Sequence, residues 1–551
     1  MYDFKNKSMY QVVYEAGLKV PHNTAIYYQK RKITFAEFLR SVDKMADVFE
    51  HKLGVHQGDV VTISLPNIPN VLIVIYALNK LGAICNLVHP YTPYNQLKVI
   101  IDKTHSKWAF VFEQRVAKEL EKFKAISHIC YVSRVEDFLP VVSKQIYHTF
   151  MNFRIRRKLQ KNWRFKGFKY FHQLKGKTSK SSTVLNNGKD VALLLQSGST
   201  TGDPKTICLS NNNINYVASK ASELMCLPEE ELIGKGMLSF LPAFHGFGLG
   251  MTMHAPLATG WASVLIPKFS PEAVVEAMKK TPVNAICGVP TAYESLIKSP
   301  VFINSQKLKN LHVCWSGGDS MSPLLKDKWD KTMKDRGSNC HLFEGYGLTE
   351  CVSAIVVSTY KHNKPNSVGY PISGTEVEIF DEKKRILKAK EIGEIGIKSE
   401  ASMVSYFADA IATDNAYHNG YILTGDLGYK DEDGFVYFTS RKKRMIKVSG
   451  VAVFPNEIER LVATVPGVKD VVAIRIPDDA LQSAVKIFVV TDVFDKEGMK
   501  QDIIDVCQRY LIRWSVPKEV EFRESLPKTT IGKTDFRKMQ EEEDLNRGIK
   551  I

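Results

Sequence analysis

The sequence predicts an α/β protein with a large N-terminal domain, which contains α/β sheets and a β-rich subdomain, and a small α+β C-terminal domain. Strand-like and helix-like segments alternate through the first 140 residues and again to about residue 316. After Gly369 the predicted strands become short and are separated by Gly, Asp and Lys turns. From about Arg444 helices and strands mix again, and the length of 551 residues suits two to four domains.

The alternation begins with a buried strand over Asp59–Leu65 and a helix over Asn70–Leu81. Repeats of this kind form βαβ units and a largely parallel sheet, and so many strands need more than one sheet. The further strands predicted here are Ala83–Leu87, Trp108–Phe112, His128–Val132, Val191–Leu195, Gly236–Phe240, Ser263–Ile266, Ala285–Gly288 and His312–Ser316.

The last third of the chain predicts shorter elements. The β-rich subdomain is expected to contain the strands Val377–Phe380, Gly393–Lys398 and Gly434–Thr439. The C-terminal domain is expected to contain helices over Pro455–Thr464 and Lys500–Tyr510 and strands over Val468–Arg475 and Ala484–Val490.

The positive charge is concentrated in one window. The chain has a net charge of +16, and Met151–Lys180 contributes +11 of it, which leaves +5 for the rest. This distribution differs from that of a uniformly basic nucleic-acid binder. Apolar residues at every fourth position of 147–163 predict a basic amphipathic helix, and aromatic residues follow it to 171. A solvated helix packed on the body, an anionic membrane surface, nucleic acid and an acidic protein partner remain alternatives.

The cysteines and the apolar segments indicate the expected redox compartment and whether the chain spans a membrane. The nine cysteines are scattered without zinc spacing, which indicates free thiols in a reducing compartment. No apolar run follows the charged N-terminus, so we expect no signal peptide. Val60–Asn79 and Gly236–Pro267 lack charged residues but contain prolines or glycines, so we expect buried strands joined by turns and no membrane span.

The strongest local signal is the segment Ser197–Lys205, which follows a predicted strand. Its hydroxyls, glycines and lysine suit a loop that binds phosphate. It is not the common G-x-x-x-x-G-K-[ST] loop, because Asp203 and Pro204 separate Gly202 from Lys205. On composition alone, a surface turn rich in Ser and Thr remains an alternative.

A second cluster is Glu344–Glu350, where glycines flank Tyr346. An aromatic face beside exposed backbone suits a flat ligand, and Glu350 could bind Mg²⁺, although a surface carboxylate is equally consistent with the pattern. Three more clusters are Thr424–Gly428, Arg441–Pro455 and Leu526–Lys533.

In this order, the five clusters resemble the motifs of the acyl-adenylate-forming superfamily, which includes acyl-CoA synthetases, luciferases and peptide-synthetase adenylation domains. The resemblance extends from about residue 10 to residue 540. It implies an AMP-binding domain at 1–440 with a basic aromatic insert at 144–180, a hinge at 441–443 and a small mobile C-terminal domain at 444–551. It also implies ATP, Mg²⁺ and coenzyme A as cofactors and a carboxylic acid as substrate.

The resemblance implies a role for each motif on the nucleotide side. Tyr346 would stack on adenine, Thr349 would contact the α-phosphate, and Glu350 would bind Mg²⁺. Asp426 and Arg441 would bind the ribose. The phosphate loop would comprise Ser197, Gly198, Ser199, Thr200, Thr201, Gly202 and Lys205, and the adenine surroundings would comprise Gly317, Gly318, Asp319, Ser320, Gly345 and Gly347.

The remaining roles concern the acid and the second half-reaction. Phe244 and His245 resemble the pair beside the acyl substrate, although a satisfied core histidine is the alternative for His245. Lys533 resembles the C-terminal lysine that reaches the carboxylate and α-phosphate. After domain rotation about Lys443, the loop Lys447, Ser449 and Gly450 would line the pantetheine tunnel.

Several residues depart from the usual family pattern. Lys443 stands where many members have Asp, but coumarate–CoA ligases and luciferases also carry Lys there. Thr206 and Ser405 stand where glycine is usual, and Ser440 where glycine or Asp is common. No predicted catalytic side chain is missing.

The acid is expected to be a medium- or long-chain fatty acid, with an aromatic or cyclic acid as the alternative. His245 stands where amino-acid-activating relatives have Asp, the segment Pro90–Pro93 resembles one of fatty acyl-CoA synthetases, and the glycines at 246, 248, 317, 318 and 345 could leave an open acyl tunnel. The protein is expected in the cytoplasm, with membrane contact at the inner face through 147–171.

Three classes of function remain open. The first is an acid–CoA ligase, the second is an acyl-AMP ligase that loads the thiol of an acyl carrier protein, and the third is a catalytically weak membrane- or nucleic-acid-binding protein. The presence of Lys205, Glu350, Asp426, Arg441 and Lys533 favours the first two.

Overall fold

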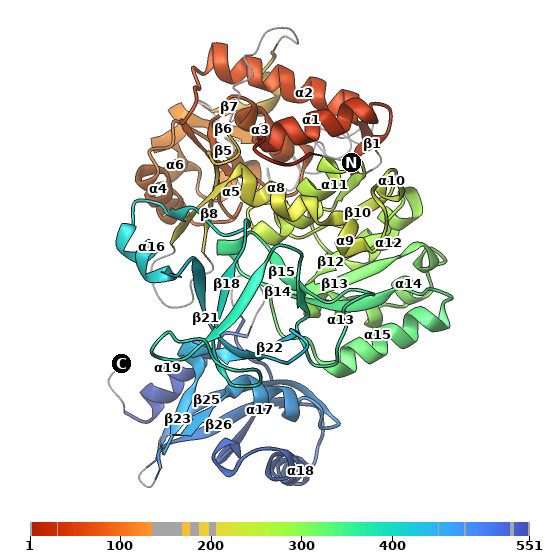
Figure 1. Ribbon diagram of the computed structural model, residues 1–551. Coiled ribbons are helices and arrows are strands. Elements are labelled where there is room, and N and C mark those ends of the chain that lie inside the picture. The colour runs from red at the N-terminus through yellow and green to blue at the C-terminus, as the bar shows by residue number, and fades with distance from the viewer. Residues whose placement is uncertain are drawn as a thin grey trace.

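The computed structural model describes residues 3–29, 31–134, 168–176, 187–197, 205–449, 451–478, 481–528 and 534–548. A large N-terminal part contains two large sheets and a smaller one, and a small C-terminal part lies at one end of the molecule (Figure 1). The predicted α/β fold class is confirmed.

The first large sheet has nine strands, in the order β16-β15-β14-β13-β12-β10-β11-β1-β2. Its centre, from β1 to β14, is parallel, as the strand–helix alternation predicts. Its strands are β1 (Thr24–Tyr28), β2 (Arg31–Thr34), β10 (Gly236–Ser239), β11 (Ala262–Leu265), β12 (Ala285–Gly288), β13 (Val313–Gly317), β14 (His341–Gly347), β15 (Ala354–Val357) and β16 (Tyr370–Pro371).

The second large sheet has eight strands, in the order β19-β9-β8-β4-β3-β5-β6-β7. Strands β9 and β19 extend one edge in antiparallel fashion. Its strands are β3 (Val60–Ser64), β4 (Ile84–Leu87), β5 (Trp108–Phe112), β6 (Cys130–Ser133), β7 (Lys169–Tyr170), β8 (Val191–Gln196), β9 (Thr206–Ser210) and β19 (Ser405–Tyr406).

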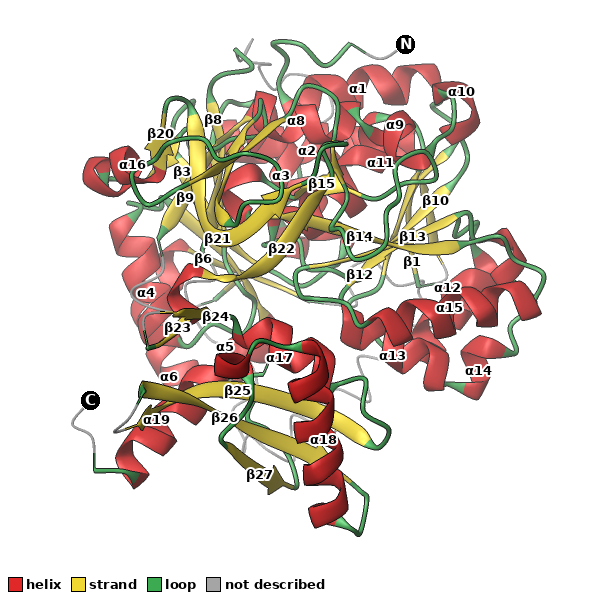
Figure 2. Cartoon of the chain, turned by 60° about the horizontal axis from the view of Figure 1, so that its bottom comes forward, coloured by secondary structure: helices red, strands yellow, loops and turns green. Residues whose placement is uncertain are grey.

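The third sheet of the N-terminal part is antiparallel and has five strands, which matches the predicted β-rich subdomain. Figure 2 shows its strands β21 and β22 between the large sheets and the C-terminal part. Its strands are β17 (Glu376–Phe380), β18 (Gly393–Lys398), β20 (Tyr417–His418), β21 (Tyr421–Lys430) and β22 (Val436–Arg441).

The C-terminal part is α+β, as predicted. It has a hairpin of β23 (Ile446–Val448) and β24 (Val451–Val453) and a sheet of β25 (Val468–Asp478), β26 (Gln482–Thr491) and β27 (Glu519–Arg523). Its helices are α17 (Pro455–Val462), α18 (Lys496–Tyr510) and α19 (Phe536–Asn546).

Helices cover the large sheets and also pack within the N-terminal part. Every residue of α3 is buried, which explains why its sequence has no polar face. Within the described residues, no helix is long and apolar enough to cross a membrane. The N-terminal helices of eight or more residues are α1 (Met9–Lys19), α2 (Phe35–Asp47), α3 (Pro69–Lys80), α4 (Tyr94–Lys103), α8 (Asn211–Ser219), α12 (Pro271–Lys280), α13 (Pro290–Lys298) and α15 (Pro323–Asp335).

The hydrophobic cores divide between the two parts. One core joins residues of both large sheets and of the β-rich subdomain. A separate core contains residues from Ile446 to Cys507 and packs β23, β25, β26, α17 and α18 together. A protein with separate cores can move one part without unpacking the other.

The expectation of buried strands joined by turns was wrong for the second half of Val60–Asn79, which belongs to the helix α3, and for the middle of Gly236–Pro267. The two ends of this second segment form β10 and β11, but the middle is a π-helix over Phe247–His254 that continues into α11 (Ala255–Ala258), and all of it is buried. Uniform apolar character does not distinguish a buried helix from buried strands, because neither has a polar face.

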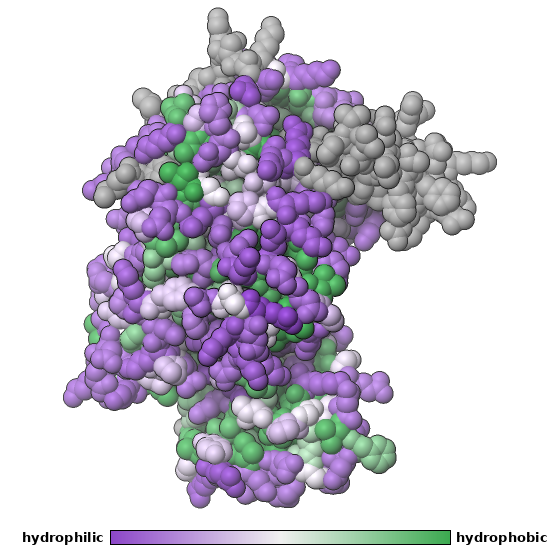
Figure 3. Space-filling model, turned by 90° about the vertical axis from the view of Figure 1, so that its right-hand side faces the viewer, coloured by the Kyte–Doolittle hydropathy of each residue, from purple (hydrophilic) through white to green (hydrophobic). Residues whose placement is uncertain are grey.

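The aromatic end of the basic window also differs from the prediction of membrane contact. Phe168 and Phe171 are buried in the core, and the Lys169 ammonium lies 5.0 Å from the centre of the Trp108 ring. These aromatic side chains are therefore unavailable to a membrane. The predicted basic helix falls within 135–167, outside the described residues. On the face in Figure 3, hydrophilic residues predominate and hydrophobic residues occur in small groups.

All nine cysteines are free, as predicted, and all except Cys226 are buried. Burial raises the pKa of thiols such as Cys85 and Cys351, so these side chains are inert core residues at neutral pH.

Candidate functional site

Three side chains of the predicted nucleotide site meet at the junction of two sheets. The Tyr346 hydroxyl on β14 donates a hydrogen bond to Asp426 Oδ2 at 2.8 Å, and Arg441 Nε lies 2.9 Å from Asp426 Oδ1. Asp426 and Arg441 are directly opposite each other in the β21–β22 pair. The tertiary structure thus brings together residues that are up to 95 positions apart.

The Asp426 carboxylate is buried, whereas its partner Arg441 is mostly exposed. Burial raises the pKa of Asp426, and the charge of Arg441 opposes that change. Burial also raises the pKa of Tyr346, which remains a hydrogen-bond donor. Arg441 pairs with Asp426 Oδ1 by charge but without hydrogen-bond geometry, and this carboxylate oxygen is buried.

Two glycine segments lie beside Tyr346. Gly317 and Gly345 are partners in the parallel β13–β14 pair, and a β-carbon on Gly317 would lie 3.0 Å from the carbonyl oxygen of Gly345. Gly318 has φ +78°, a conformation that favours glycine. Asp319 and Ser320, which follow, are exposed, and the Ser320 N–H donates to Asp319 Oδ1. Backbone in this region is therefore accessible to a flat ligand.

Glu350 lies in a short 3₁₀ turn, Thr349–Cys351, after β14. Its Oε1 accepts a hydrogen bond from the Tyr406 hydroxyl at 2.9 Å. The described residues contain no group of three or more His, Cys, Asp or Glu side chains that could hold a metal ion by themselves. The single carboxylate of Glu350 is compatible with Mg²⁺, which typically binds through one or two carboxylates together with phosphate oxygens.

The two ends of the phosphate loop are held by the β8–β9 pair. The Ser197 N–H donates to the Lys205 carbonyl at 2.8 Å, and the Lys205 N–H donates to Ser197 Oγ at 2.9 Å. The Lys205 ammonium lies 4.5 Å from the centre of the Tyr406 ring. The predicted loop residues Gly198, Ser199, Thr200, Thr201 and Gly202 lie outside the described residues.

Thr206, one of the departures from the family pattern, is buried and donates to Gln196 Oε1 at 3.1 Å. The threonine therefore fits as a bridge across the base of the loop.

His245 is exposed at the start of the buried helical segment, so it is not a core histidine. The ring of the preceding Phe244 packs against that of His89, with 4.7 Å between the ring centres. Burial lowers the pKa of His89, and its Nδ1 accepts a hydrogen bond from the Tyr91 N–H. His89, which directly precedes the segment Pro90–Pro93, thus contacts the predicted acyl motif.

The expectation that glycines leave an open acyl tunnel was wrong for most of them. A β-carbon on Gly246 would lie 1.8 Å from the Val352 carbonyl oxygen, and one on Gly248 would lie 2.1 Å from that of Pro242. Gly317 and Gly345 are also closely packed, and only Gly318 of the five has room around it. These glycines allow backbone segments to approach each other.

The predicted C-terminal site residues are exposed where they are described. Lys447 lies on β23, and Ser449 lies in the turn between β23 and β24 with φ +48°. Gly450 and Lys533 lie outside the described residues. Lys528 and Thr534, on either side of 529–533, form an isolated antiparallel bridge.

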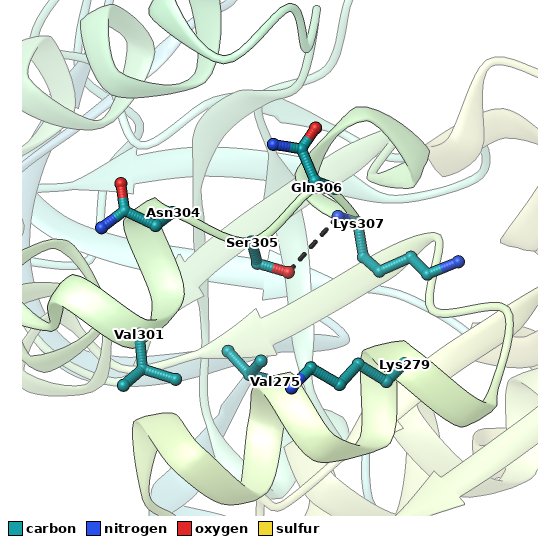
Figure 4. A pocket seen from close by; sticks show the side chains of 7 residues that line it. All are labelled: Val275, Lys279, Val301, Asn304, Ser305, Gln306 and Lys307. Carbon is teal, nitrogen blue, oxygen red and sulfur yellow. Dashed lines mark hydrogen bonds between the residues drawn. The ribbon is translucent and has the colours of Figure 1, made fainter.

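A pocket of about 300 Å³ lies away from these residues, beside α12 and α14 (Pro300–Ile303) (Figure 4). Its lining includes Val275, Lys279, Val301 and Ser305, and none of the predicted site residues. The candidate site is therefore defined by its side chains and not by this cavity.

Sequence reasoning missed Tyr406 as a link between motifs. Its hydroxyl binds Glu350, and its ring lies beside Lys205. Burial raises the pKa of Tyr406, so the hydroxyl keeps its proton. Its neighbour Ser405 was noted only as a departure from the family pattern, and pairing of β19 with β9 explains why Tyr406 reaches the loop.

The fold combines a large N-terminal part and a small C-terminal part, and several of the predicted nucleotide motifs meet in the large part. Residues 13–407 match the model of the AMP-binding enzyme family, and 457–533 match that of the AMP-binding enzyme C-terminal domain. The chain therefore belongs to the AMP-binding enzymes, which confirms the resemblance to the acyl-adenylate-forming superfamily.

Curated relatives cover almost the whole chain. It is 28% identical to a long-chain-fatty-acid–CoA ligase of Bacillus subtilis, over 99% of this chain and 96% of the relative. It is 30% identical to a long-chain-fatty-acid–CoA ligase of Escherichia coli, over 93% and 90%.

Solved structures share the fold. An anthranilate–CoA ligase in complex with anthranoyl-AMP superposes with a TM-score of 0.83 at 20% identity, covering 99% of this chain and 98% of that one. A benzoate–CoA ligase from Burkholderia xenovorans has a TM-score of 0.80 at 17% identity, covering 97% and 99%.

Proposed function

We propose that this chain is an ATP-dependent fatty acid–CoA ligase. The acid carboxylate attacks the α-phosphorus of ATP, which gives acyl-AMP and pyrophosphate, and the CoA thiol then takes the acyl group and releases AMP. The observation that carries the proposal is the Tyr346–Asp426–Arg441 cluster, because it brings together a carboxylate acceptor, a phenol and a guanidinium, which are groups that suit the ribose of a nucleotide. The full-length similarity to long-chain-fatty-acid–CoA ligases supports the substrate class.

On the nucleotide side, Asp426 accepts hydrogen bonds from the ribose hydroxyls and Arg441 completes that contact. Tyr346 stacks on adenine, and Gly318, Asp319 and Ser320 line it with Gly345 and Gly347. Thr349 contacts the α-phosphate. The buried position of Asp426 supports this assignment, since a hydrogen bond to a charged acceptor is stronger where water is excluded.

On the phosphate side, Ser197 and Lys205 hold the loop that binds the β- and γ-phosphates. Glu350 would hold Mg²⁺, which when bound offsets the negative charge of the phosphates. Tyr406 orients Glu350 through Oε1, which leaves Oε2 for the ion. Lys533 stabilises the charge that develops as the carboxylate attacks.

We place the domain boundary at 441–443. The Lys442 ammonium binds Glu394 of β18 at 2.7 Å, whereas Arg444 binds Glu459 of α17 at 2.6 Å. Residues on the two sides of Lys443 are thus tied to different domains, which supports Lys443 as the hinge. Lys447, Ser449 and Gly450 contact CoA after the C-terminal domain rotates.

Fatty acids and aromatic acids remain two substrate classes to separate. The loop around Tyr91 and the ligase relatives support a long-chain acid, whereas a 4-coumarate–CoA ligase-like protein of Arabidopsis thaliana is 28% identical over 91% of this chain. His245 contacts the acyl group in either case.

The test is AMP release by the purified protein with MgATP across a panel of carboxylic acids, with and without CoA. CoA-dependent turnover that is fastest with long-chain fatty acids is the expected result. Accumulation of acyl-AMP that only an acyl carrier protein discharges would instead identify a carrier-loading ligase. An absence of acid-dependent pyrophosphate release, with the protein folded, would overturn the proposal.

A further inference from the structure

The residue after the Thr349–Cys351 turn has an unusual backbone. Val352 has φ +66° and ψ −56°, and the Ser353 N–H donates to the Cys351 carbonyl at 2.7 Å. This is a γ-turn of the rare, strained kind. A β-branched residue at positive φ is a genuine outlier, and Val352 is fully buried. Such strain persists only where the surroundings impose it, and it often marks a functional site.

The surroundings that impose this turn are glycines. A β-carbon on Gly246 would lie 1.8 Å from the Val352 carbonyl oxygen, and one on Gly250 would lie 2.9 Å from Val352 Cγ1. From the other side, a β-carbon on Gly347 would lie 1.9 Å from the Ser353 carbonyl oxygen. The γ-turn therefore fits into a groove that exists only because these three positions lack side chains.

The γ-turn joins two parts of the candidate site. The Val352 N–H donates to the Thr349 carbonyl at 3.0 Å, which closes the turn that contains Glu350. Gly246, against which the γ-turn packs, directly follows His245. The phosphate-side and acyl-side motifs, about 105 residues apart, thus contact each other through the backbone of Val352.

We propose that Val352 is a positioning residue, whose γ-turn, packed against Gly246 and Gly250, holds Thr349 and Glu350 in fixed relation to the Phe244–His245 segment. The inference deepens the proposed function and depends on it for the roles of Glu350 and His245. Packing alone would predict only lost stability when Val352 is changed. Positioning predicts a specific loss on the metal and nucleotide side.

The test compares Val352→Ala with Val352→Gly. Both remove the isopropyl group, but only glycine adopts positive φ without strain. We expect Val352→Gly to have the higher thermal unfolding midpoint of the two. We also expect it to need at least about fivefold more Mg²⁺ for half-maximal pyrophosphate release and for calorimetric binding of a non-hydrolysable ATP analogue, because the freed turn no longer fixes Glu350. Thioester formation from supplied acyl-AMP and CoA should stay within about twofold of wild type.

Val217→Ala is the matched control. Val217 is buried against the same helix, 3.9 Å from a β-carbon on Gly250, but it does not belong to the turn. It should lose stability and keep the wild-type Mg²⁺ requirement. An unchanged Mg²⁺ requirement in Val352→Gly, or equal loss in both half-reactions, would overturn the proposal.

Gly250→Ala provides a second variant if the Val352 variants fold poorly. The added methyl group reaches the same turn from the helix, so the Mg²⁺ requirement should rise, and wild-type dependence would contradict the proposal. If the wild type itself releases no pyrophosphate with any acid, the proposed function fails. The stability order of Val352→Ala and Val352→Gly still tests the strained turn in that case.

Discussion

Two regions of the candidate site are built in different ways. One is the proposed ribose side, around Asp426, and the other is the proposed lysine side, next to 529–533. Asp426 is buried and held by Tyr346 and Arg441, which come from a different sheet and from the adjacent strand. Lys533 lies outside the described residues, and next to the segment 529–533 the Lys528 ammonium donates to Asp470 Oδ2 at 2.5 Å and to Thr534 Oγ1 at 2.8 Å. The Lys528 and Asp470 side chains are 45% and 32% exposed.

This difference follows from where charge interactions are strong. A buried carboxylate interacts strongly with its neighbours because little water screens it, whereas exposed ion pairs contribute at most about 1 kcal/mol. The ribose side can therefore be preformed. The Lys528–Asp470 ion pair is largely exposed, so it contributes little to the stability of the structure next to 529–533.

The largest expected effect comes from Lys533→Ala. Acyl-AMP formation should fall by at least about 100-fold, because the positive charge near the reacting phosphate is lost. Thioester formation from supplied acyl-AMP should persist, since that step does not need the lysine. Pyrophosphate release and CoA thioester formation are measured separately, and equal losses in both would refute the assigned role.

Asp426→Ala should mainly weaken nucleotide binding. Loss of hydrogen bonds to a charged acceptor costs about 1.5–3 kcal/mol, so the KM for ATP should rise about 10- to 100-fold. Asp431→Asn is the control, because Asp431 is also buried but pairs with Lys364. It should leave the KM for ATP unchanged. An unaltered KM in Asp426→Ala would remove Asp426 from the ribose site.

The variant Glu344→Gln tests how the raised pKa of Glu344, on the same strand as Tyr346, affects the pH dependence of stability. Burial raises the pKa of Glu344 from 4.5 to about 7, while Lys326 and Arg460 act in the opposite direction. Since the folded pKa is the higher one, wild-type stability is full below about pH 4.5 and falls as pH rises through 7.

Glutamine does not titrate, so the free energy of unfolding of Glu344→Gln should rise relative to wild type across this window, by up to about 3 kcal/mol. Midpoints measured from pH 4.5 to 8 provide the check. A constant difference over that range would show that Glu344 keeps an ordinary pKa.

The smallest effect is expected from Lys528→Met on the exposed side. Acyl-AMP formation should slow about twofold to fivefold, which matches the contribution of an exposed ion pair, and thioester formation should not change. Lys469→Met is the control. Lys469 lies on β25, the strand that also carries Asp470, and it forms an exposed ion pair with Asp492. If both variants slow acyl-AMP formation equally, the contacts of Lys528 have no specific role.

Local patterns in the sequence were sufficient for much of the fold. The strand over Trp108–Phe112 and the strand over Ala285–Gly288 have the predicted bounds, and the helix predicted at Asn70–Leu81 is found at Pro69–Lys80. These predictions succeed because hydrophobic periodicity and helix-terminating residues act within a few positions of the chain. The motifs Glu344–Glu350 and Thr424–Gly428 were likewise visible as local clusters.

Which segments contact each other was decided only by the tertiary structure. The sequence gives no sign that Tyr346 binds Asp426, that Tyr406 binds Glu350, or that Gly246 accommodates the Val352 turn. A glycine that leaves space and a glycine that admits a neighbouring backbone look the same in a sequence. The sequence by itself determined the fold class, the chemical groups and their order, because these depend on neighbours in the chain. Their meeting in one site depends on packing between distant segments, which only the folded structure specifies.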